Sequence, residues 1–266
     1  MKWHRIAAML YKHALLMRRG TRLLEIFYWP MLDLLVWGYV SVYIMRVQAG
    51  GGRGFPDFVA LFLGGLIFWE VLFRSQQAIT ISFLEDVWAR NLLNLFVSPL
   101  TPGEFIVSTI LLGIVKTAVG AVVMGVVAYL LYSFNVLSIG LPLVLFFANL
   151  LLLGWAIGIV TTTLIMRYGQ SAEVLAWGLA FLVQPFTCVF YPLSALPKIL
   201  QKVAWWIPAT HIFEGMRQVI AGQGFSGAHL AWSFGLSLAY LAVAAVFFRW
   251  MFGLVKERGL LMKLEQ

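Results

Sequence analysis

Charged residues are scarce in this chain of 266 residues, and their scarcity excludes a soluble globular protein. Asp, Glu, Lys and Arg make up 11% of the sequence, whereas 62% of it is hydrophobic; soluble domains carry about 25% charged residues. The mean hydropathy is +0.89. No stretch between the apolar runs is long enough to form a soluble catalytic domain. We therefore expect a single membrane domain, residues 1–266, that works within or across the bilayer.

Cysteine is nearly absent, because Cys188 is the only one, and this excludes an intrachain disulfide or a cysteine metal site. The four histidines are scattered and form no H-E-x-x-H motif. The sequence also lacks a G-x-S-x-G elbow, a P-loop and an aspartate-rich D-x-x-x-D pair. We expect no catalytic residue, no cofactor and no metal in this chain. If ATP drives the protein, another chain must bind it.

Long apolar runs fill most of the sequence. A hydrocarbon core of ~30 Å requires about 20 apolar residues of helix. The runs predict an all-α fold with six transmembrane helices, at residues 23–45, 58–82, 105–132, 141–166, 174–191 and 230–252. The fourth run contains Gly154 and Gly158 in a G-x-x-x-G pattern, which permits close helix packing.

Positive charge is concentrated near the two termini, and this sets the expected topology. With six spans both termini lie on one side, and the positive-inside rule places that side in the cytoplasm. No cleavage site follows the first run, so we expect the N-terminus to be retained. Topology and headgroup attraction account for the net charge of +8 without nucleic-acid binding. The basic residues concerned are Lys2, Arg5, Lys12, Arg18, Arg19, Arg22, Lys256, Arg258 and Lys263.

Residues 2–19 are predicted to form an amphipathic helix. Lys2, Arg5, Lys12 and Arg19 share an arc of about 100° at 3.6 residues per turn, and the opposite side is apolar. This pattern favours a helix lying in the inner membrane interface. The alternative is a plain cytoplasmic extension of the first span.

The link at residues 84–104 is the most structured cytoplasmic connection. Residues 85–96 predict a short helix lying along the membrane, with polar residues on one side and apolar residues on the other. Ser98 and Pro99 end it. Thr101, Pro102 and Glu104 then form a predicted capping box that starts the third span.

Residues 191–222 predict a broken, re-entrant helical hairpin on the outer face. Proline interrupts it repeatedly, and its two helical pieces are too short and too polar to span. Irregular backbone survives at membrane depth only where protein or water satisfies it. Trp205 and Trp206 fit an interfacial aromatic belt, or alternatively an exit that contacts sugars or lipid headgroups.

Four charged residues lie well inside the predicted spans, away from the span ends: Asp33, Glu70, Arg74 and Lys116. Such residues are costly in a bilayer and mark either a function or a pairing. Glu70 and Arg74 are four apart on one helix face and can pair. Lys116 is expected to meet Asp33 or Glu70 from a neighbouring helix. The group forms either a translocation path or an internal charge network that fixes helix packing.

Two stretches, together with the topology, resemble the membrane subunits of ATP-binding-cassette exporters of the ABC-2 type. The first is NLLNLFVSPLTPGEFIVSTIL, which starts at Asn91. The second is YPLSALPKILQKVAWWIPATHIFEGMRQ, which starts at Tyr191. The second carries the family's Pro-x-Thr-His and Glu-x-x-Arg patterns as Pro208, Thr210, His211, Glu214 and Arg217.

This resemblance implies a permease that dimerises, most simply with a second copy of itself, and binds two cytoplasmic ATPase subunits, which hold ATP and Mg²⁺. It places the protein, with its surrounding lipids, in a bacterial inner membrane. The segment around residues 85–94 would be the coupling helix that docks on the ATPase, through Glu85, Asp86, Trp88, Arg90, Asn91 and Asn94. The outer gate would comprise Tyr191, Trp205, Trp206, His211, Glu214 and Arg217.

The resemblance does not choose among amphipathic, glycan and lipophilic cargoes. An integral-membrane lipid or prenyl transferase is an alternative, but it needs acidic or histidine residues clustered at a membrane face. An ion-coupled secondary transporter is another, and it usually needs repeat symmetry and more spans.

Overall fold

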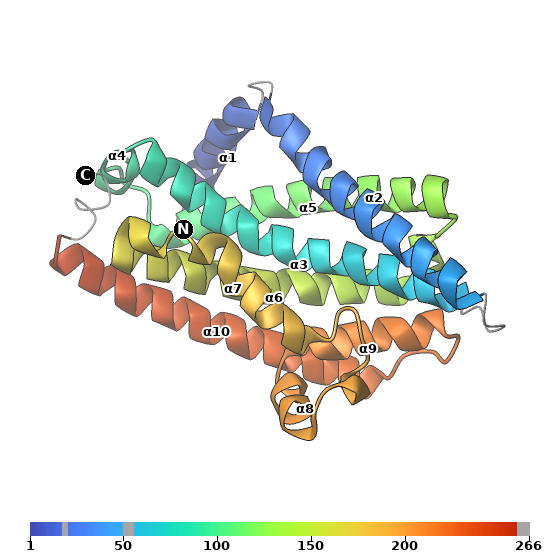
Figure 1. Ribbon diagram of the computed structural model, residues 1–266. Helices are drawn as coiled ribbons and strands as arrows, with labels where there is room; N and C mark the ends of the chain where they lie inside the picture. Colours follow the sequence, from blue (N-terminus) through green and yellow to red (C-terminus); the bar gives the residue numbers. More distant parts are fainter. Residues whose placement is uncertain (18–20, 50–55, 260–266) are drawn as a thin grey trace.

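The computed structural model describes residues 1–17, 21–49 and 56–259, and this part of the chain is helical without any strand (Figure 1). The elements are α1 (Trp3–Met17), α2 (Thr21–Ala49), α3 (Pro56–Trp88), α4 (Leu92–Val97), α5 (Pro102–Tyr132), η1 (Val136–Ile139), α6 (Leu141–Tyr168), η2 (Gly169–Ala172), α7 (Leu175–Thr187), η3 (Leu193–Ala195), α8 (Lys198–Trp205), α9 (Pro208–Ile220) and α10 (Gly227–Glu257).

Five of the described helices, α2, α3, α5, α6 and α10, are long and apolar enough to cross a membrane. The fifth predicted run, residues 174–191, forms a shorter helix than expected, because α7 has 13 residues and a length of about 20 Å. Cys188 ends it in the left-handed conformation, at φ 58°. Within the described ranges, the chain therefore has five helices of spanning length and one short apolar helix, as a multi-pass membrane protein does.

Helices α3 and α6 pack face to face at the centre of the bundle. The two glycines of the G-x-x-x-G pattern face α3: a Cβ on Gly154 would lie 2.6 Å from the Leu72 carbonyl, and one on Gly158 would lie 2.8 Å from the Gln76 carbonyl. Both glycines thus allow the close approach of α6 to α3 that such a pattern permits. Helices α2 and α5 pack against α3, and α10 packs along α6.

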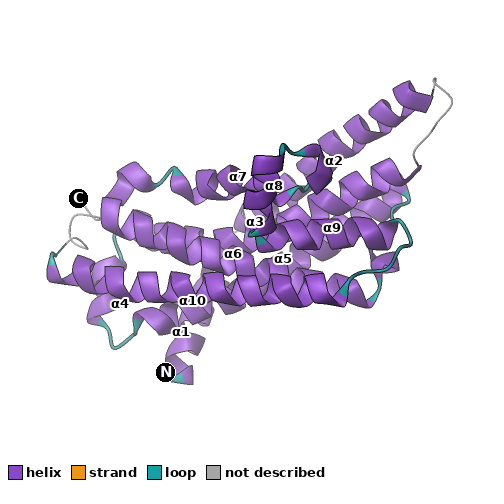
Figure 2. Ribbon diagram, turned by 90° about the horizontal axis from the view of Figure 1, so that it is seen from below, coloured by secondary structure: helices purple, strands orange, loops and turns teal. Residues whose placement is uncertain are grey.

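The bundle has two distinct ends (Figures 1 and 2). The terminal end carries α1, α4 and the last turns of α10. The hairpin end carries α9, η1 and the start of α3. Each end has its own buried core, centred on Phe83 and Phe105 at the terminal end and on Phe146 and Phe213 at the hairpin end.

Helix α1 crosses the terminal end and buries one side. Ile6, Met9 and His13 are buried, whereas Trp3 and Tyr11 are largely exposed. Apolar residues therefore face both the protein and the surroundings, which agrees with a helix at an interface. Residues 18 and 19, the end of the predicted amphipathic helix, lie outside the described part of the chain.

Candidate functional site

The turn between α3 and α4 corrects the helix predicted over residues 85–96. Helix α3 continues to Trp88, and α4 begins only at Leu92. The N–H of Asn91 bonds the Asp86 carbonyl at 2.9 Å, and that of Arg90 bonds the Val87 carbonyl at 2.9 Å. This is a Schellman ending with Arg90 in the left-handed position, at φ 51°. Glycine usually marks such an ending, and no glycine stands at this position, so the end of α3 at Trp88 was not evident from the residues.

The six residues expected to couple to an ATPase divide into two groups. Trp88 is 51% exposed, and Arg90 and Asn94 are also exposed. Asp86 is 3% exposed and accepts a hydrogen bond of 3.1 Å from the Asn91 amide. In the segment at residues 88–94, named here the α3–α4 tip, Trp88, Arg90 and Asn94 therefore face the surroundings, while Asp86 and Asn91 hold the turn. Glu85 is half-buried on the last turns of α3.

Helix α1 fastens this turn to the start of α5. Lys12 forms an ion pair with Asp86, and Arg5 lies 3.5 Å from Glu104 and donates to the Pro99 carbonyl. The Lys2 backbone N–H also donates to Glu104 at 2.7 Å. We call the Lys12–Asp86 and Arg5–Glu104 pairs the α1 clamp. Sequence reasoning missed it because the partners are far apart in the chain.

The capping box predicted at residues 101–104 is confirmed. The Thr101 hydroxyl accepts from the Glu104 N–H at 3.3 Å, and the Glu104 carboxylate accepts from the Thr101 N–H at 2.9 Å. Glu104 thus fixes the first turn of α5 while also receiving α1. One buried carboxylate joins the two helices.

Three of the four charges inside the spans come together. Glu70 and Arg74 form the predicted ion pair on α3, and Asp33 of α2 interacts electrostatically with both. The Arg74 side chain extends toward α5, where a Cβ on Gly120 would lie 3.3 Å from it. Lys116 lies half-buried one turn earlier on α5, and its acidic partner stays a prediction.

The segment expected to be an outer hairpin is folded and largely packed. α9 buries most of its residues, including Phe213 and Met216, against α10, α6 and α3. Gly222, at φ 71°, follows its end. The shorter α8 has one buried residue, Ala204, and projects from the side of the bundle (Figure 1).

Glu214 and Arg217 hold the chain that precedes α8. The Arg217 Nη1 atom and the Glu214 Oε1 atom lie 3.0 Å apart. Arg217 also donates to the Tyr191 carbonyl at 2.8 Å and to the Cys188 carbonyl, and Glu214 accepts from the Leu193 N–H at 2.6 Å. The pair therefore satisfies backbone groups that α7 and η3 leave open. Burial lowers the pKa of Arg217, although the neighbouring Glu214 opposes this effect.

A small cavity of about 150 Å³ brings together three of the predicted gate residues, Trp205, His211 and Glu214. The His211 Nε2 lies 2.8 Å from the Trp205 carbonyl, and its Nδ1 lies 3.4 Å from the Nδ1 of His229. Burial lowers the pKa of His211, so the ring favours its neutral form. Trp206 lies elsewhere, against Trp232.

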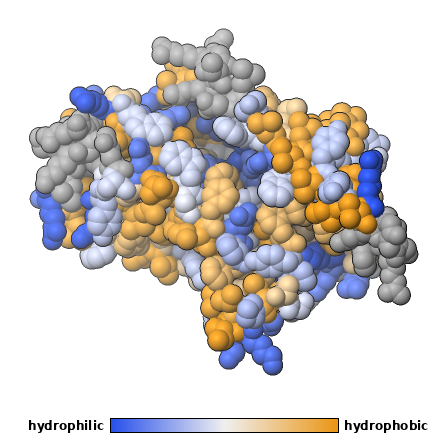
Figure 3. Space-filling view, in the orientation of Figure 1, coloured by the Kyte–Doolittle hydropathy of each residue, from blue (hydrophilic) through white to orange (hydrophobic). Residues whose placement is uncertain are grey.

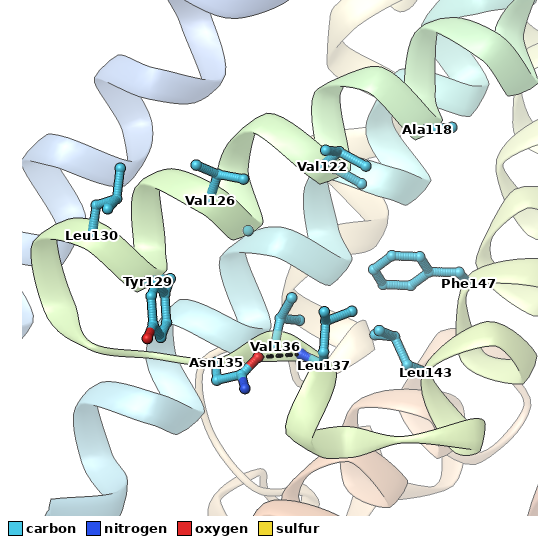
Figure 4. Close-up of a pocket in the computed structure, with 12 residues that line it drawn as sticks. Ala118, Val122, Val126, Tyr129, Leu130, Asn135, Val136, Leu137, Leu143 and Phe147 are labelled. Carbon is cyan, nitrogen blue, oxygen red and sulfur yellow. Dashed lines mark hydrogen bonds between the residues drawn. The ribbon is translucent and has the colours of Figure 1, made fainter.

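A larger groove, of about 600 Å³, is lined mainly by apolar residues (Figure 4). It runs along α5 and is closed by η1 and α6, and none of its lining residues is acidic or basic. Asn135 uses its side-chain oxygen to cap η1, bonding the Leu137 N–H at 3.0 Å. None of the predicted site residues lines this groove.

A buried polar network, which sequence reasoning missed, ties α6, α9 and α10 together. Asn149 donates to Ser233 at 3.0 Å and accepts from Ser237, and Ser233 donates to the Pro208 carbonyl at 2.8 Å. Asn149 within an otherwise apolar run was the available signal.

The comparison with known families agrees with this architecture. Residues 5–221, most of the chain, match the family described as "ABC-2 type transporter". A search of curated proteins finds no match. The chain therefore belongs to the ABC-2 type transporter family and is the membrane, or permease, component of an ATP-binding-cassette transporter.

Proposed function

We propose that this chain forms, with a second copy of itself, the translocation path of an exporter driven by a separate ATPase. The cargo is amphipathic, glycan or lipophilic and moves outward from the cytoplasm or inner leaflet. ATP and Mg²⁺ bind to the partner subunit. The location is a bacterial inner membrane, with the terminal end of the bundle in the cytoplasm.

The observation that carries the proposal is the α3–α4 tip. It exposes Trp88, Arg90 and Asn94 at the same end as the basic N-terminal helix, which is the end that the positive-inside rule assigns to the cytoplasm. The α1 clamp fixes the tip to α5. A movement of the ATPase that displaces the tip would therefore move α3 and α5 together, because the tip is not a loose loop.

The charge group in the middle of the bundle supports a dimeric path. Asp33 is exposed on α2, yet a carboxylate exposed to hydrocarbon is costly. A second copy, or water in a path between two copies, would solvate it. Exposed aromatic residues of the same helix, among them Trp37, Tyr39 and Tyr43, would then face the cargo or the other copy.

The test uses the exposed residues of the tip. Arg90→Asn combined with Asn94→Ala removes two exposed side chains, and Asn tolerates the left-handed conformation of position 90. We expect the variant to insert and to keep its melting temperature, but ATP hydrolysis by the co-reconstituted ATPase should no longer drive transport. Asp86 is unsuitable here because its loss would disturb the turn itself.

The control is Lys198→Gln, which changes an exposed residue of α8 outside the α3–α4 tip. Coupling in that variant should equal that of the unmodified protein. Normal coupling in the Arg90→Asn, Asn94→Ala variant would remove the tip from the ATPase interface.

A further inference from the structure

A second groove, of about 500 Å³, lies between the projecting α8 and the bundle. Residues of α6, α7 and α10 line one side of the groove, and residues of α8 and of the chain that follows it line the other. The lining residues are Leu153, Ile157, Val183, Lys202, Val203, Trp206, Ile207, Pro208 and Tyr240. All but Lys202 and Tyr240 are apolar or tryptophan, so the groove has an apolar floor and one cation.

Helix α10 shows the depth of this groove in a bilayer. Its 31 residues are about 46 Å long, so a centred α10 extends about 8 Å beyond each side of a ~30 Å core. Trp232, five residues after its start, then falls at the hydrocarbon boundary. The Trp206 ring lies 5.9 Å from the Trp232 ring, and paired tryptophans at this level are typical of membrane interfaces. Tyr240 lies two turns deeper and donates to the Trp206 carbonyl at 3.3 Å.

We infer that the cation lies near this boundary, because Lys202 precedes Trp206 by about one helical turn. Lys202 is one turn before Trp206 and is exposed, and it forms no ion pair with any residue in the described ranges. Figure 3 shows the projection with hydrophobic residues on one side and hydrophilic residues at its tip. A positively charged amine beside an apolar groove is complementary in charge and polarity to a molecule with an anionic headgroup and a hydrocarbon tail.

We propose that this groove binds an anionic phospholipid of the outer leaflet, with an acyl chain against Leu153 and Ile157 and the phosphate at Lys202. The proposal rests on the orientation in the membrane given above. A bound lipid would fill the space under α8 and hold it against α10. The position of the outer hairpin would then depend on the lipid composition of the outer leaflet.

The experiment measures lipid binding to the purified full chain in detergent, by native mass spectrometry and by the melting temperature. The probes are phosphatidylglycerol and phosphatidylcholine with identical acyl chains. We expect phosphatidylglycerol to bind more tightly, and Lys202→Gln to weaken its binding about fivefold, the effect of one basic residue at an anionic surface. Binding of phosphatidylcholine, whose choline group offsets the charge of its phosphate, should weaken less in this variant.

Two further variants separate this site from general adsorption. Lys198→Gln removes the other lysine of α8, which does not line the groove, and should leave the preference for phosphatidylglycerol intact. Val183→Phe places a ring in the groove and should weaken the binding of both lipids. Equal binding of the two lipids, or equal losses in Lys202→Gln and Lys198→Gln, would overturn the proposal. The assay needs neither ATPase nor cargo, so its failure would leave the exporter function standing.

Discussion

The two ends of the bundle both hold a short helix with ion pairs, but they use those pairs differently. At the terminal end, Lys12 reaches Asp86 across 74 positions of sequence, and the pair joins separate helices through a partly exposed lysine and a buried carboxylate. At the hairpin end, Glu214 and Arg217 are three residues apart on α9 and bind backbone groups of the preceding chain. The Lys12–Asp86 pair links separate helices, whereas the Glu214–Arg217 pair satisfies backbone groups of the neighbouring chain.

Burial shows the same contrast. The α3–α4 tip has Trp88 half exposed beside the α1 clamp, whereas Ile212, Phe213 and Met216 of α9 are completely buried. The terminal end therefore offers a surface positioned by polar contacts, and the hairpin end is secured mainly by packing. We expect charge and salt to perturb the first end, and cavities and lost backbone contacts to perturb the second.

The largest loss of stability is expected at the Glu70–Arg74 ion pair, which lies between the two ends of the bundle. Glu70→Gln combined with Asp33→Asn leaves Arg74 without its carboxylates in the middle of the bundle, and stranding a buried charge costs about 3–5 kcal/mol. Lys116→Met, which removes a cation instead, should be tolerated better. Expression level and melting temperature in detergent are the measurements. An intact melting temperature in the double variant would show that these charges do not stabilise the bundle.

Arg217→Met should have the next largest effect, because it removes one ion pair and two hydrogen bonds to backbone carbonyls. We expect a loss of about 2–4 kcal/mol, seen as a melting temperature lower by roughly 5–10 °C. Lys198→Met is the matched control, since that lysine is exposed on α8. Similar losses in both variants would mean that the Arg217 contacts contribute little.

Accessibility tests the same region without relying on stability. Ala204, Ala209 and Met216 are at most 1% exposed, whereas Ile199 is 78% exposed. In a Cys188→Ala background, single cysteines at the first three positions should resist a membrane-impermeant thiol reagent, and a cysteine at position 199 should react. Adding Arg217→Met should expose position 209 or 216. Full labelling at all four positions, with and without ATP, would indicate a solvated loop instead of a packed α9.

The parts of the fold that follow from local pattern were predictable from sequence. The five long helices, the capping box at Thr101 and the pairing of Glu70 with Arg74 each depend on residues within four positions of one another or on a continuous apolar run. The end of α3 was not predictable, because Arg90 occupies a position that glycine usually takes. The α1 clamp was not predictable either, since nothing near Lys12 in sequence identifies Asp86 as its partner.

Asp86→Asn should have a smaller effect, confined to the terminal end. It removes the charge that Lys12 contacts but keeps a hydrogen-bonding side chain, and Lys12 retains access to water because its side chain is 31% exposed. We expect a loss of about 1–2 kcal/mol, and high salt should narrow the difference from the unmodified protein. Lys12→Met should give a similar loss with the same salt dependence. A loss that salt does not change would argue for packing rather than charge at this turn.

The smallest expected effect is a pH dependence at the hairpin end. Burial lowers the pKa of His211 below its ordinary value, and this outweighs the opposing influence of the Trp205 carbonyl and Glu214, while His229 acts in the same direction as burial. The unfolded chain then binds a proton at a higher pH than the folded chain does, so the stability that His211 contributes is present above its unfolded pKa and declines as the pH falls toward its folded pKa. Protonation would also place a second N–H between the two imidazoles, whose Nδ1 atoms are 3.4 Å apart. The melting temperature should therefore fall slightly between pH 7.5 and pH 5.5, and His211→Gln should reduce that slope. An unchanged slope in His211→Gln would show that the acid sensitivity of the protein does not come from His211.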